Sequence, residues 1–141
     1  MKTLLIYSLF LVYNSAIAQT FDGLWKGTIT RDYGNEVVTD TIELDLQQQG
    51  TKITGYSLWY KANGIYIRSV LEGFYNDQNK TLRLTETSID FQNIPDRGEL
   101  VFLDQYLLTF DVKDKLVLTG KSVSRERKPI YSRSKMRVRK I

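Results

Sequence analysis

Residues 37–47, with the sequence VVTDTIELDLQ, alternate apolar and polar side chains through their second half. Ile42, Leu44 and Leu46 fall on one face of an extended chain, and Glu43 lies on the opposite face with its polar neighbours. A period of two residues is typical of a β-strand that has one face buried and the other in water. This stretch therefore predicts a half-buried strand and sets the pattern by which the rest of the chain is interpreted.

Seven other segments are rich in apolar and β-branched residues and are bounded by turn-forming residues. They are residues 24–31, 52–60, 65–75, 81–89, 100–112, 116–123 and 130–141. Asn63-Gly64 marks a hairpin, because both residues tolerate the positive φ angles of a tight turn. Eight strands joined by turns favour an all-β fold with up-and-down antiparallel order, and closure into a barrel leaves no strand edge unpaired. The predicted fold is an eight-stranded antiparallel barrel, with a two-sheet sandwich as the alternative.

The first residues predict export. Lys2 supplies a positive charge, an apolar run follows over residues 4–12, and Ala16-Ile17-Ala18 gives the small-x-small pattern of a cleavage site. The apolar run is shorter than the ~20 residues that span a bilayer. We therefore predict a signal peptide over residues 1–18 and a single β-barrel domain over residues 19–141. The expected location is the periplasm or the medium, and without cysteine no lipid anchor is expected.

Composition narrows the chemistry of this domain. The chain has no histidine and no cysteine, which removes the Ser-His-Asp and Cys-His systems and the usual zinc ligands. We predict a non-catalytic protein with no metal and no cofactor. Nine Lys or Arg and one acidic residue lie in residues 121–141. Because these basic residues alternate with other types, a basic outer face of the last strand is favoured over a nucleic-acid contact.

Four motifs resemble the calycin superfamily of lipocalins, fatty-acid-binding proteins and avidins. Residues 21–27, FDGLWKG, resemble its Gly-x-Trp opening, and residues 53–57, ITGYS, are similar to the second hairpin of avidin-like barrels. Residues 71–73 and 82–86 resemble those of small exported lipocalin-like proteins common in Bacteroidetes. The resemblance implies an eight-stranded barrel whose interior holds a small ligand.

The resemblance also carries implications for individual residues. Gly27 and Ser57 stand where avidins place biotin-contacting side chains of other types, so we do not predict biotin binding. In lipocalins the early Trp packs against an Arg near the end of the barrel. By analogy, Trp25 is expected to be buried and to close one end of the barrel with Arg137 or Arg139, through a cation–π contact.

Extending the inward parity of the apolar residues along three strands places several polar and aromatic side chains inside the barrel. They are Ser57, Trp59, Ser69, Glu86 and Ser88. Glu86 is the most informative, because a buried charge is costly unless it is paired. Its carboxylate either orients a ligand at one mouth of the barrel, or pairs with an arginine, or lies exposed beyond the buried stretch.

Three aromatic residues, Trp59, Tyr60 and Tyr66, flank the Asn63-Gly64 turn. They are candidates for a platform that holds a sugar or a flat apolar ligand at that end of the barrel. Alternatively, they form cross-strand packing pairs beside the hairpin. The predicted ligand site therefore comprises these three aromatic residues with Ser57, Ser69 and Glu86.

Three functions follow from these patterns, in decreasing order of preference. The first is a barrel that binds a small apolar or aromatic molecule. The second is a structural or interaction barrel with a filled interior that presents its surface to a protein or polysaccharide. The third is an eight-stranded outer-membrane barrel. The last strand argues against a membrane-spanning protein, because one of its faces carries basic residues and the other carries serines, and neither is a lipid-facing apolar band.

Overall fold

The computed structural model describes residues 20–61, 63–93, 103–124 and 133–141. The predicted signal peptide, residues 1–18, lies outside these described residues. Parts of the sixth and eighth predicted strands, residues 100–102 and 130–132, also lie outside them. Among the described residues, no helix is long and apolar enough to cross a membrane.

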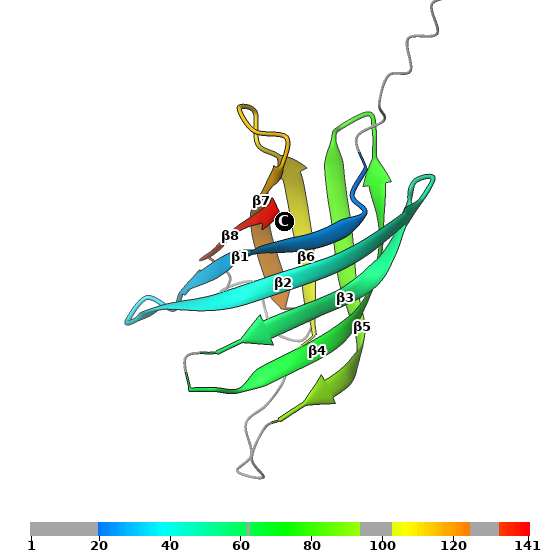
Figure 1. Ribbon diagram of the computed structural model, residues 1–141. Coiled ribbons are helices and arrows are strands. Elements are labelled where there is room, and N and C mark those ends of the chain that lie inside the picture. Colours follow the sequence, from blue (N-terminus) through cyan, green and yellow to red (C-terminus); the bar gives the residue numbers. More distant parts are fainter. Residues whose placement is uncertain (1–19, 62, 94–102, 125–132) are drawn as a thin grey trace, which may run out of the picture.

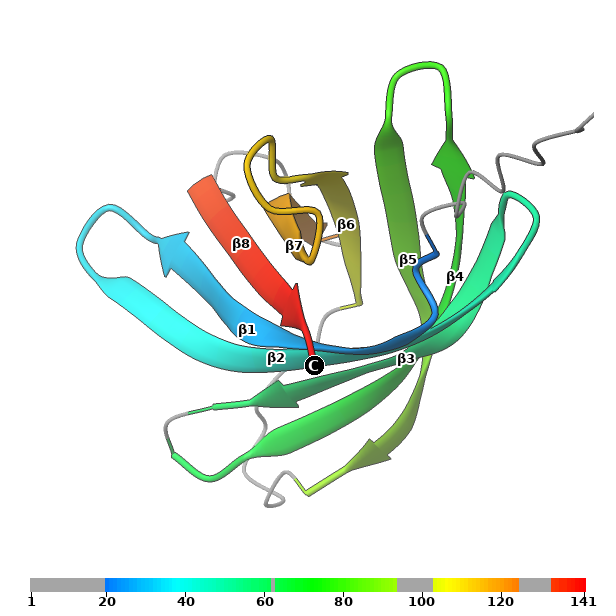
Figure 2. The ribbon, with the colours of Figure 1, turned by 45° about the horizontal axis from the view of Figure 1, so that its top comes forward.

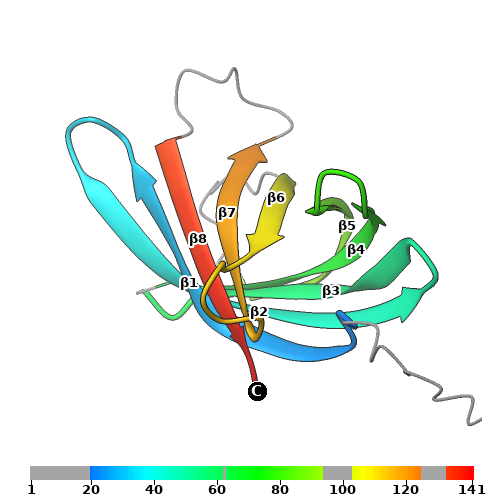
Figure 3. The same cartoon turned by 90° about the horizontal axis from the view of Figure 1, so that it is seen from above.

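Eight strands make up the fold, and they follow the predicted segments closely. They are β1 (Gly23–Asp32), β2 (Val37–Gln49), β3 (Lys52–Tyr60), β4 (Tyr66–Asn76), β5 (Thr81–Gln92), β6 (Asp104–Phe110), β7 (Val117–Ser124) and β8 (Arg133–Lys140). Each strand pairs antiparallel with the next, and β8 pairs with β1 to close the barrel. Figure 1 shows β1 and β2 crossing in front of β6 and β7, and Figure 3 shows β8 lying between β1 and β7. The predicted up-and-down barrel is confirmed.

The antiparallel registers give the barrel two distinct ends. The turns that join β2 to β3, β4 to β5 and β6 to β7 lie at one end, with Ile141. We call this the Trp25 end, after the residue that fills it. The turns that join β1 to β2 and β3 to β4 lie at the opposite end, which we call the Glu86 end. The two ends differ in the types of side chain that point inward.

An aromatic cluster fills the Trp25 end. Phe21 lies just before β1, and its ring stacks on Phe110 and packs against Tyr75, with both centroid distances 4.9 Å. Trp25 is fully buried, and its indole N–H donates a 2.9 Å hydrogen bond to the carbonyl of Phe21. That bond satisfies the one polar atom of the indole, so Trp25 can be buried among the other rings. The packed rings close this end of the barrel.

Apolar side chains fill the middle of the barrel, as the alternating pattern predicts. Ile42, Leu44 and Leu46 of β2 are all buried. Burying such a side chain contributes about 1.5–3 kcal/mol relative to leaving it in water. Gly27 permits the close approach of β1 to β8, since a Cβ placed there would lie 1.9 Å from the carbonyl oxygen of Arg137.

The pairing between β5 and β6 is short. Among the described residues it runs over Leu82–Thr85, whereas β5 stays paired with β4 as far as Gln92. Figure 2 shows the later part of β5 running away from β6. The β4–β5 ladder also has register shifts between Arg68 and Ser69 and between Val70 and Leu71. The barrel wall is therefore least regular at the Glu86 end.

Candidate functional site

Six side chains from four strands meet inside the Glu86 end, and we call them the inner polar cluster. They are Arg31 of β1, Ser57 and Trp59 of β3, Glu86 of β5, and Asp104 and Tyr106 of β6. All except Arg31 are buried, and the side chain of Arg31 is 23% exposed. The cluster occupies the place that apolar side chains fill in the middle of the barrel.

Glu86 is the centre of the cluster. One carboxylate oxygen, Oε1, accepts hydrogen bonds from Ser57 Oγ at 2.5 Å, Tyr106 Oη at 2.6 Å and Trp59 Nε1 at 3.1 Å. The other, Oε2, accepts a 2.8 Å hydrogen bond from the backbone N–H of Asp104. This last bond lies where the β5–β6 ladder has stopped, so a side chain replaces a strand partner for that N–H. The four bonds offset the cost of burying the carboxylate.

Arg31 connects the cluster to the rim of the barrel. Its guanidinium forms an ion pair with Asp104 and lies over the Trp59 ring, 4.3 Å from the ring centroid. The planar guanidinium can make both contacts at once, because it stacks by its face and donates by its edge. Arg31 therefore holds the indole of Trp59 and the carboxylate of Asp104 in fixed positions.

Burial shapes the electrostatics of the site. It raises the pKa of Asp104 to about 6, and the nearby Glu86 charge adds to the rise, while Arg31 opposes it. Burial, followed by the same two carboxylates, also raises the pKa of Tyr106 well above its usual value. Tyr106 is therefore a neutral phenol that donates to Glu86. Burial also raises the pKa of Asp40, which points inward from β2 near this end.

One hydroxyl beside the cluster lacks a partner. Ser69 of β4 lies directly across from Ser57 of β3 and is 1% exposed. Within the described part of the chain, its Oγ is the buried side-chain polar atom that makes no hydrogen bond. A buried hydroxyl with no partner costs about 1–3 kcal/mol. Ser69 thus presents an unused donor and acceptor to the interior.

Four of the six predicted ligand-site residues lie inside the barrel: Ser57, Trp59, Ser69 and Glu86. The structure brings Ser57 and Trp59 together on Glu86, with Ser69 beside them. Ser88, which the same parity placed inside, is exposed. The register shift explains this, because Leu71 pairs with Glu86 while the preceding Val70 pairs with Ser88.

Tyr60 and Tyr66 lie outside the barrel, away from the inner polar cluster. Each is adjacent in sequence to an inward residue, Trp59 and Ile67 respectively, and so points the opposite way. Tyr66 stacks on Phe91 with a centroid distance of 5.2 Å and lies 6.3 Å from the Tyr60 ring. The two tyrosines form cross-strand packing pairs on the outer face, which is the alternative that the sequence left open.

Trp25 is buried as expected, but its cationic neighbour differs from the expectation. Lys140 Nζ lies 5.6 Å from the centroid of the Trp25 ring. Arg137 and Arg139 point outward and form ion pairs with Asp111 and Asp114. The alternation of β8 accounts for this, because Met136 and Val138 take the inward positions.

Six buried or half-buried residues with polar groups at the Glu86 end are not among the predicted site residues. They are Arg31, Asp40, Asp104, Tyr106, Ser122 and Ser134. Each shares the parity of buried apolar residues on its own strand, such as Ile29 for Arg31 and Leu108 for Tyr106. That parity is the signal that finds them. Their mutual contacts depend on the register between strands, which parity does not give.

The inner polar cluster holds buried donors and acceptors in fixed geometry, and the hydroxyl of Ser69 beside it is unused. Within the described ranges, no group of three or more His, Cys, Asp or Glu side chains is arranged to hold a metal ion. Comparisons with protein-family models and with curated proteins found no match. The closed eight-stranded antiparallel barrel is compatible with a lipocalin-like fold.

Proposed function

We propose that this protein is an exported, lipocalin-like barrel that binds a small, partly apolar molecule at its Glu86 end without catalysing a reaction. The single observation that carries the proposal is the buried, unpartnered Oγ of Ser69 beside the inner polar cluster. A ligand with a polar group would satisfy this hydroxyl, and the Trp59 ring would supply apolar contact. Such a combination of apolar wall and few polar groups is typical of small-molecule sites.

Two further observations support a barrel that works in water and has no nucleic-acid partner. The inner face is mainly apolar, while charged ion pairs such as Lys26–Glu43 lie on the outer face. An outer-membrane barrel has the opposite arrangement, with an apolar outer band. On β8, Arg137 and Arg139 are paired with Asp111 and Asp114, which reduces the positive charge offered to phosphates.

Tryptophan fluorescence tests the ligand site. The chain has two tryptophans, so Trp25→Phe leaves Trp59 as the only reporter and Trp59→Phe leaves Trp25. Titration with fatty acids, indole derivatives and flavonoids should change the emission of Trp59 for at least one compound and leave that of Trp25 nearly unchanged. Emission changes confined to Trp25 would contradict a site at the Glu86 end.

Ser69→Ala separates binding from packing. If Ser69 contacts the ligand, this variant should lose about tenfold in affinity, which corresponds to one neutral hydrogen bond. Its thermal stability should not fall, because the removed hydroxyl has no partner to lose. The exposed Ser88→Ala is the matched control and should change neither property. If no compound alters Trp59 emission, the filled interaction barrel becomes the better description.

The proposed export has its own test. N-terminal sequencing of the protein recovered from the periplasm or the medium should begin at Gln19, after the Ala16-Ile17-Ala18 pattern. Recovery of the full-length chain from the membrane fraction would contradict a cleaved signal peptide.

A further inference from the structure

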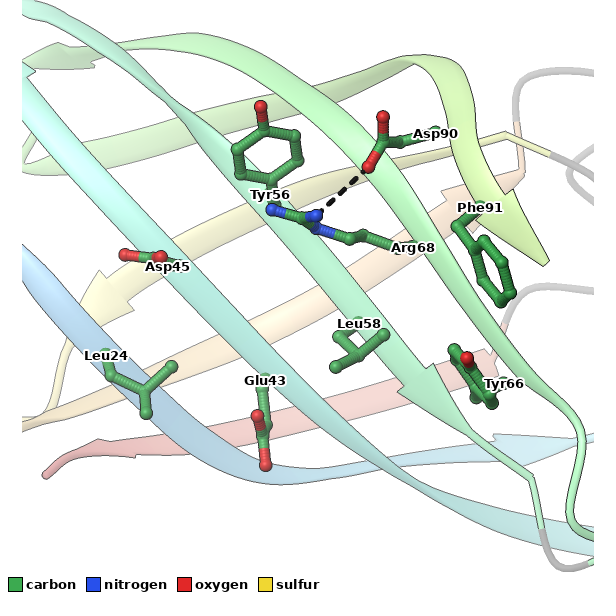
Figure 4. Close-up of a pocket in the computed structure, with 9 residues that line it drawn as sticks. All are labelled: Leu24, Glu43, Asp45, Tyr56, Leu58, Tyr66, Arg68, Asp90 and Phe91. Carbon is green, nitrogen blue, oxygen red and sulfur yellow. Dashed lines mark ion pairs between the residues drawn. The ribbon is translucent and has the colours of Figure 1, made fainter.

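A concave site lies on the outer face of the barrel, and its lining residues are separate from the inner polar cluster. Its cavity volume is about 540 Å³, and it spans the outward side chains of β1 to β5. We call it the outer pocket. Figure 4 shows Tyr56, Arg68 and Asp90 on one side of it and Tyr66 and Phe91 on another. Its volume lies within the roughly 300–1,000 Å³ typical of small-molecule sites.

Aromatic rings give the outer pocket exposed flat surfaces. Tyr56 is 37% exposed and Phe91 is 48% exposed. Phe91 and Tyr66 are stacked with an interplanar angle of 19°, so each covers one face of the other, and the exposed part of Phe91 offers apolar surface to the pocket. Leu58 lies between these rings and Tyr56 along the pocket lining. Exposed aromatic residues gathered in one concavity point to a binding surface, since scattered ones need no explanation.

Polar groups of the outer pocket are held in fixed positions. Arg68 lies over the Tyr56 ring at 3.8 Å from its centroid and forms a 3.1 Å ion pair with Asp90. Glu43 is paired with Lys26 at 2.7 Å. These two pairs are each neutral overall, yet Arg68 and Asp90 still present donors and acceptors to the pocket, and Glu43 presents acceptors. Fixing them in advance lowers the entropy cost of binding a ligand.

We propose that the outer pocket binds one neutral sugar unit of an oligosaccharide or polysaccharide chain. The ring face of a sugar carries C–H groups that stack on aromatic rings, and its edge carries hydroxyls that both donate and accept hydrogen bonds. The Tyr66–Phe91 pair matches the first property, and the Arg68–Asp90 pair matches the second. An organic cation fits less well, because Arg68 already covers Tyr56. A polyanion fits less well, because Glu43, Asp45 and Asp90 line the pocket.

Calorimetric titration of the purified protein with cellohexaose, chitohexaose, laminarihexaose and mannohexaose tests this site. At least one should bind, and Phe91→Ala should weaken that binding about tenfold, the size of one aromatic contact. Arg68→Lys should weaken it as well, because lysine keeps the charge but loses the planar stacking and the two-pronged donor geometry. Binding should change little between low and high salt, because the ligand is neutral.

Phe74→Ala is the matched control. Phe74 is 49% exposed, close to the 48% of Phe91, and Arg83 lies 6.0 Å from the centroid of its ring, much as Arg68 lies over Tyr56 in the pocket. It lies outside the pocket lining. Phe74→Ala should therefore leave saccharide binding unchanged. Equal loss of affinity in the Phe74 and Phe91 variants would overturn the proposal.

Two other outcomes would also overturn the outer pocket as a saccharide site. One is that none of the four oligosaccharides binds. This result overturns the proposal whether or not sedimentation experiments show self-association of the protein through Phe91. The other is saccharide binding that changes Trp59 emission and is lost in Ser69→Ala. That result would place the sugar inside the barrel and support the function proposed above, so the two proposals fail separately.

Discussion

The two ends of the barrel are built from the same alternating strands but are closed in opposite ways. At the Trp25 end, four aromatic rings pack together and the indole N–H has a backbone partner. At the Glu86 end, two carboxylates and a guanidinium lie among a tryptophan, a tyrosine and serines. Packed rings stabilise a fold directly, whereas a buried ionic network must first offset its own desolvation. The difference teaches that packing at the Trp25 end contributes more directly to stability, and it is the reason for placing the proposed ligand site at the Glu86 end.

Backbone geometry separates the ends in the same way. At the Trp25 end, short hairpin turns hold the strands in register, and the amide of Ile141 bonds to the carbonyl of Leu24. At the Glu86 end, β5 leaves β6 after Thr85, and the amide of Asp104 donates to Glu86 in place of a strand partner. Irregular backbone and register shifts concentrate where function is expected.

Trp25→Ala should have the largest effect on stability. The substitution removes the largest buried side chain of the aromatic cluster and leaves a cavity, at a cost of about 3–5 kcal/mol. Urea unfolding followed by circular dichroism should show this loss. A midpoint unchanged from that of the wild type would show that the Trp25 end does not secure the fold.

Asp104 at the Glu86 end and Asp22 at the Trp25 end should contribute to the pH dependence of stability with opposite signs. Asp104 has a pKa of about 6 in the folded protein, above its ordinary value of 3.8. Between these values the folded state binds more protons than the unfolded chain, so stability falls as pH rises through this window. The contribution of this group is about 3 kcal/mol at most. Urea unfolding at several pH values should show the decline, and Asp104→Asn should remove it.

Asp22, at the Trp25 end, is the control for that sign. The backbone N–H of Gln48 and the hydroxyl of Thr20 lower its pKa below 3.8. Its contribution to stability is present above this ordinary value and is lost as pH falls below it. Asp22→Asn should therefore lower stability above this ordinary value, and the difference from the wild type should disappear in the acidic range, where the Asp22 carboxyl is protonated. A flattened slope near pH 5 in Asp22→Asn, with none in Asp104→Asn, would reverse the electrostatic assignment of the two ends.

Most of the fold follows from the sequence because β-strand alternation is a local property. The period of two in Ile42, Leu44 and Leu46 identifies the inward face, and Asn63-Gly64 identifies a hairpin without reference to the rest of the chain. The same parity finds Ser57 and Glu86 inside the barrel. Each of these inferences needs only neighbours in sequence, and the structure agrees with each.

The remainder of the site depends on contacts between strands. Ser88 is exposed because of a register shift, which no local pattern marks. Arg31 meets Asp104 across 73 positions in the chain, so their ion pair appears only once the barrel closes. Lys140, which follows the regular alternation of β8, takes the place over Trp25 that the resemblance assigned to Arg137 or Arg139. Closure and register are therefore the missing information.

Glu86→Gln should have an intermediate effect on stability. The amide keeps the shape of the side chain, but its NH₂ group replaces one of the two oxygens that accept hydrogen bonds. At least one donor among Ser57, Tyr106 and the Asp104 amide then lacks an acceptor, whereas the Trp59 indole N–H keeps Tyr106 Oη at 2.7 Å. We expect a loss of about 2 kcal/mol in urea unfolding. If Glu86→Gln were more stable than the wild type, the carboxylate would be shown to lower the free energy of unfolding. That result would strengthen the case for a ligand.

Lys140→Met should have the smallest effect, and it tests how the Trp25 end is closed. Lys140 Nζ lies 5.6 Å from the Trp25 ring, and a cation–π contact at a partly exposed site contributes about 0.5–1 kcal/mol. Methionine keeps most of the length and apolar surface of the lysine stem, so the changes are the loss of the charge and of the 3.3 Å hydrogen bond from Lys140 Nζ to the Thr20 carbonyl. Arg139→Met is the matched control, because Arg139 neighbours Lys140 in sequence but points outward to Asp114. Thermal melts should show a small decrease for Lys140→Met and no decrease for Arg139→Met, since exposed ion pairs contribute little. The reverse result would mean that an arginine of β8 closes this end, as in the lipocalins that the sequence resembles. Equal melting temperatures for both variants and the wild type would assign the closure to the aromatic rings alone.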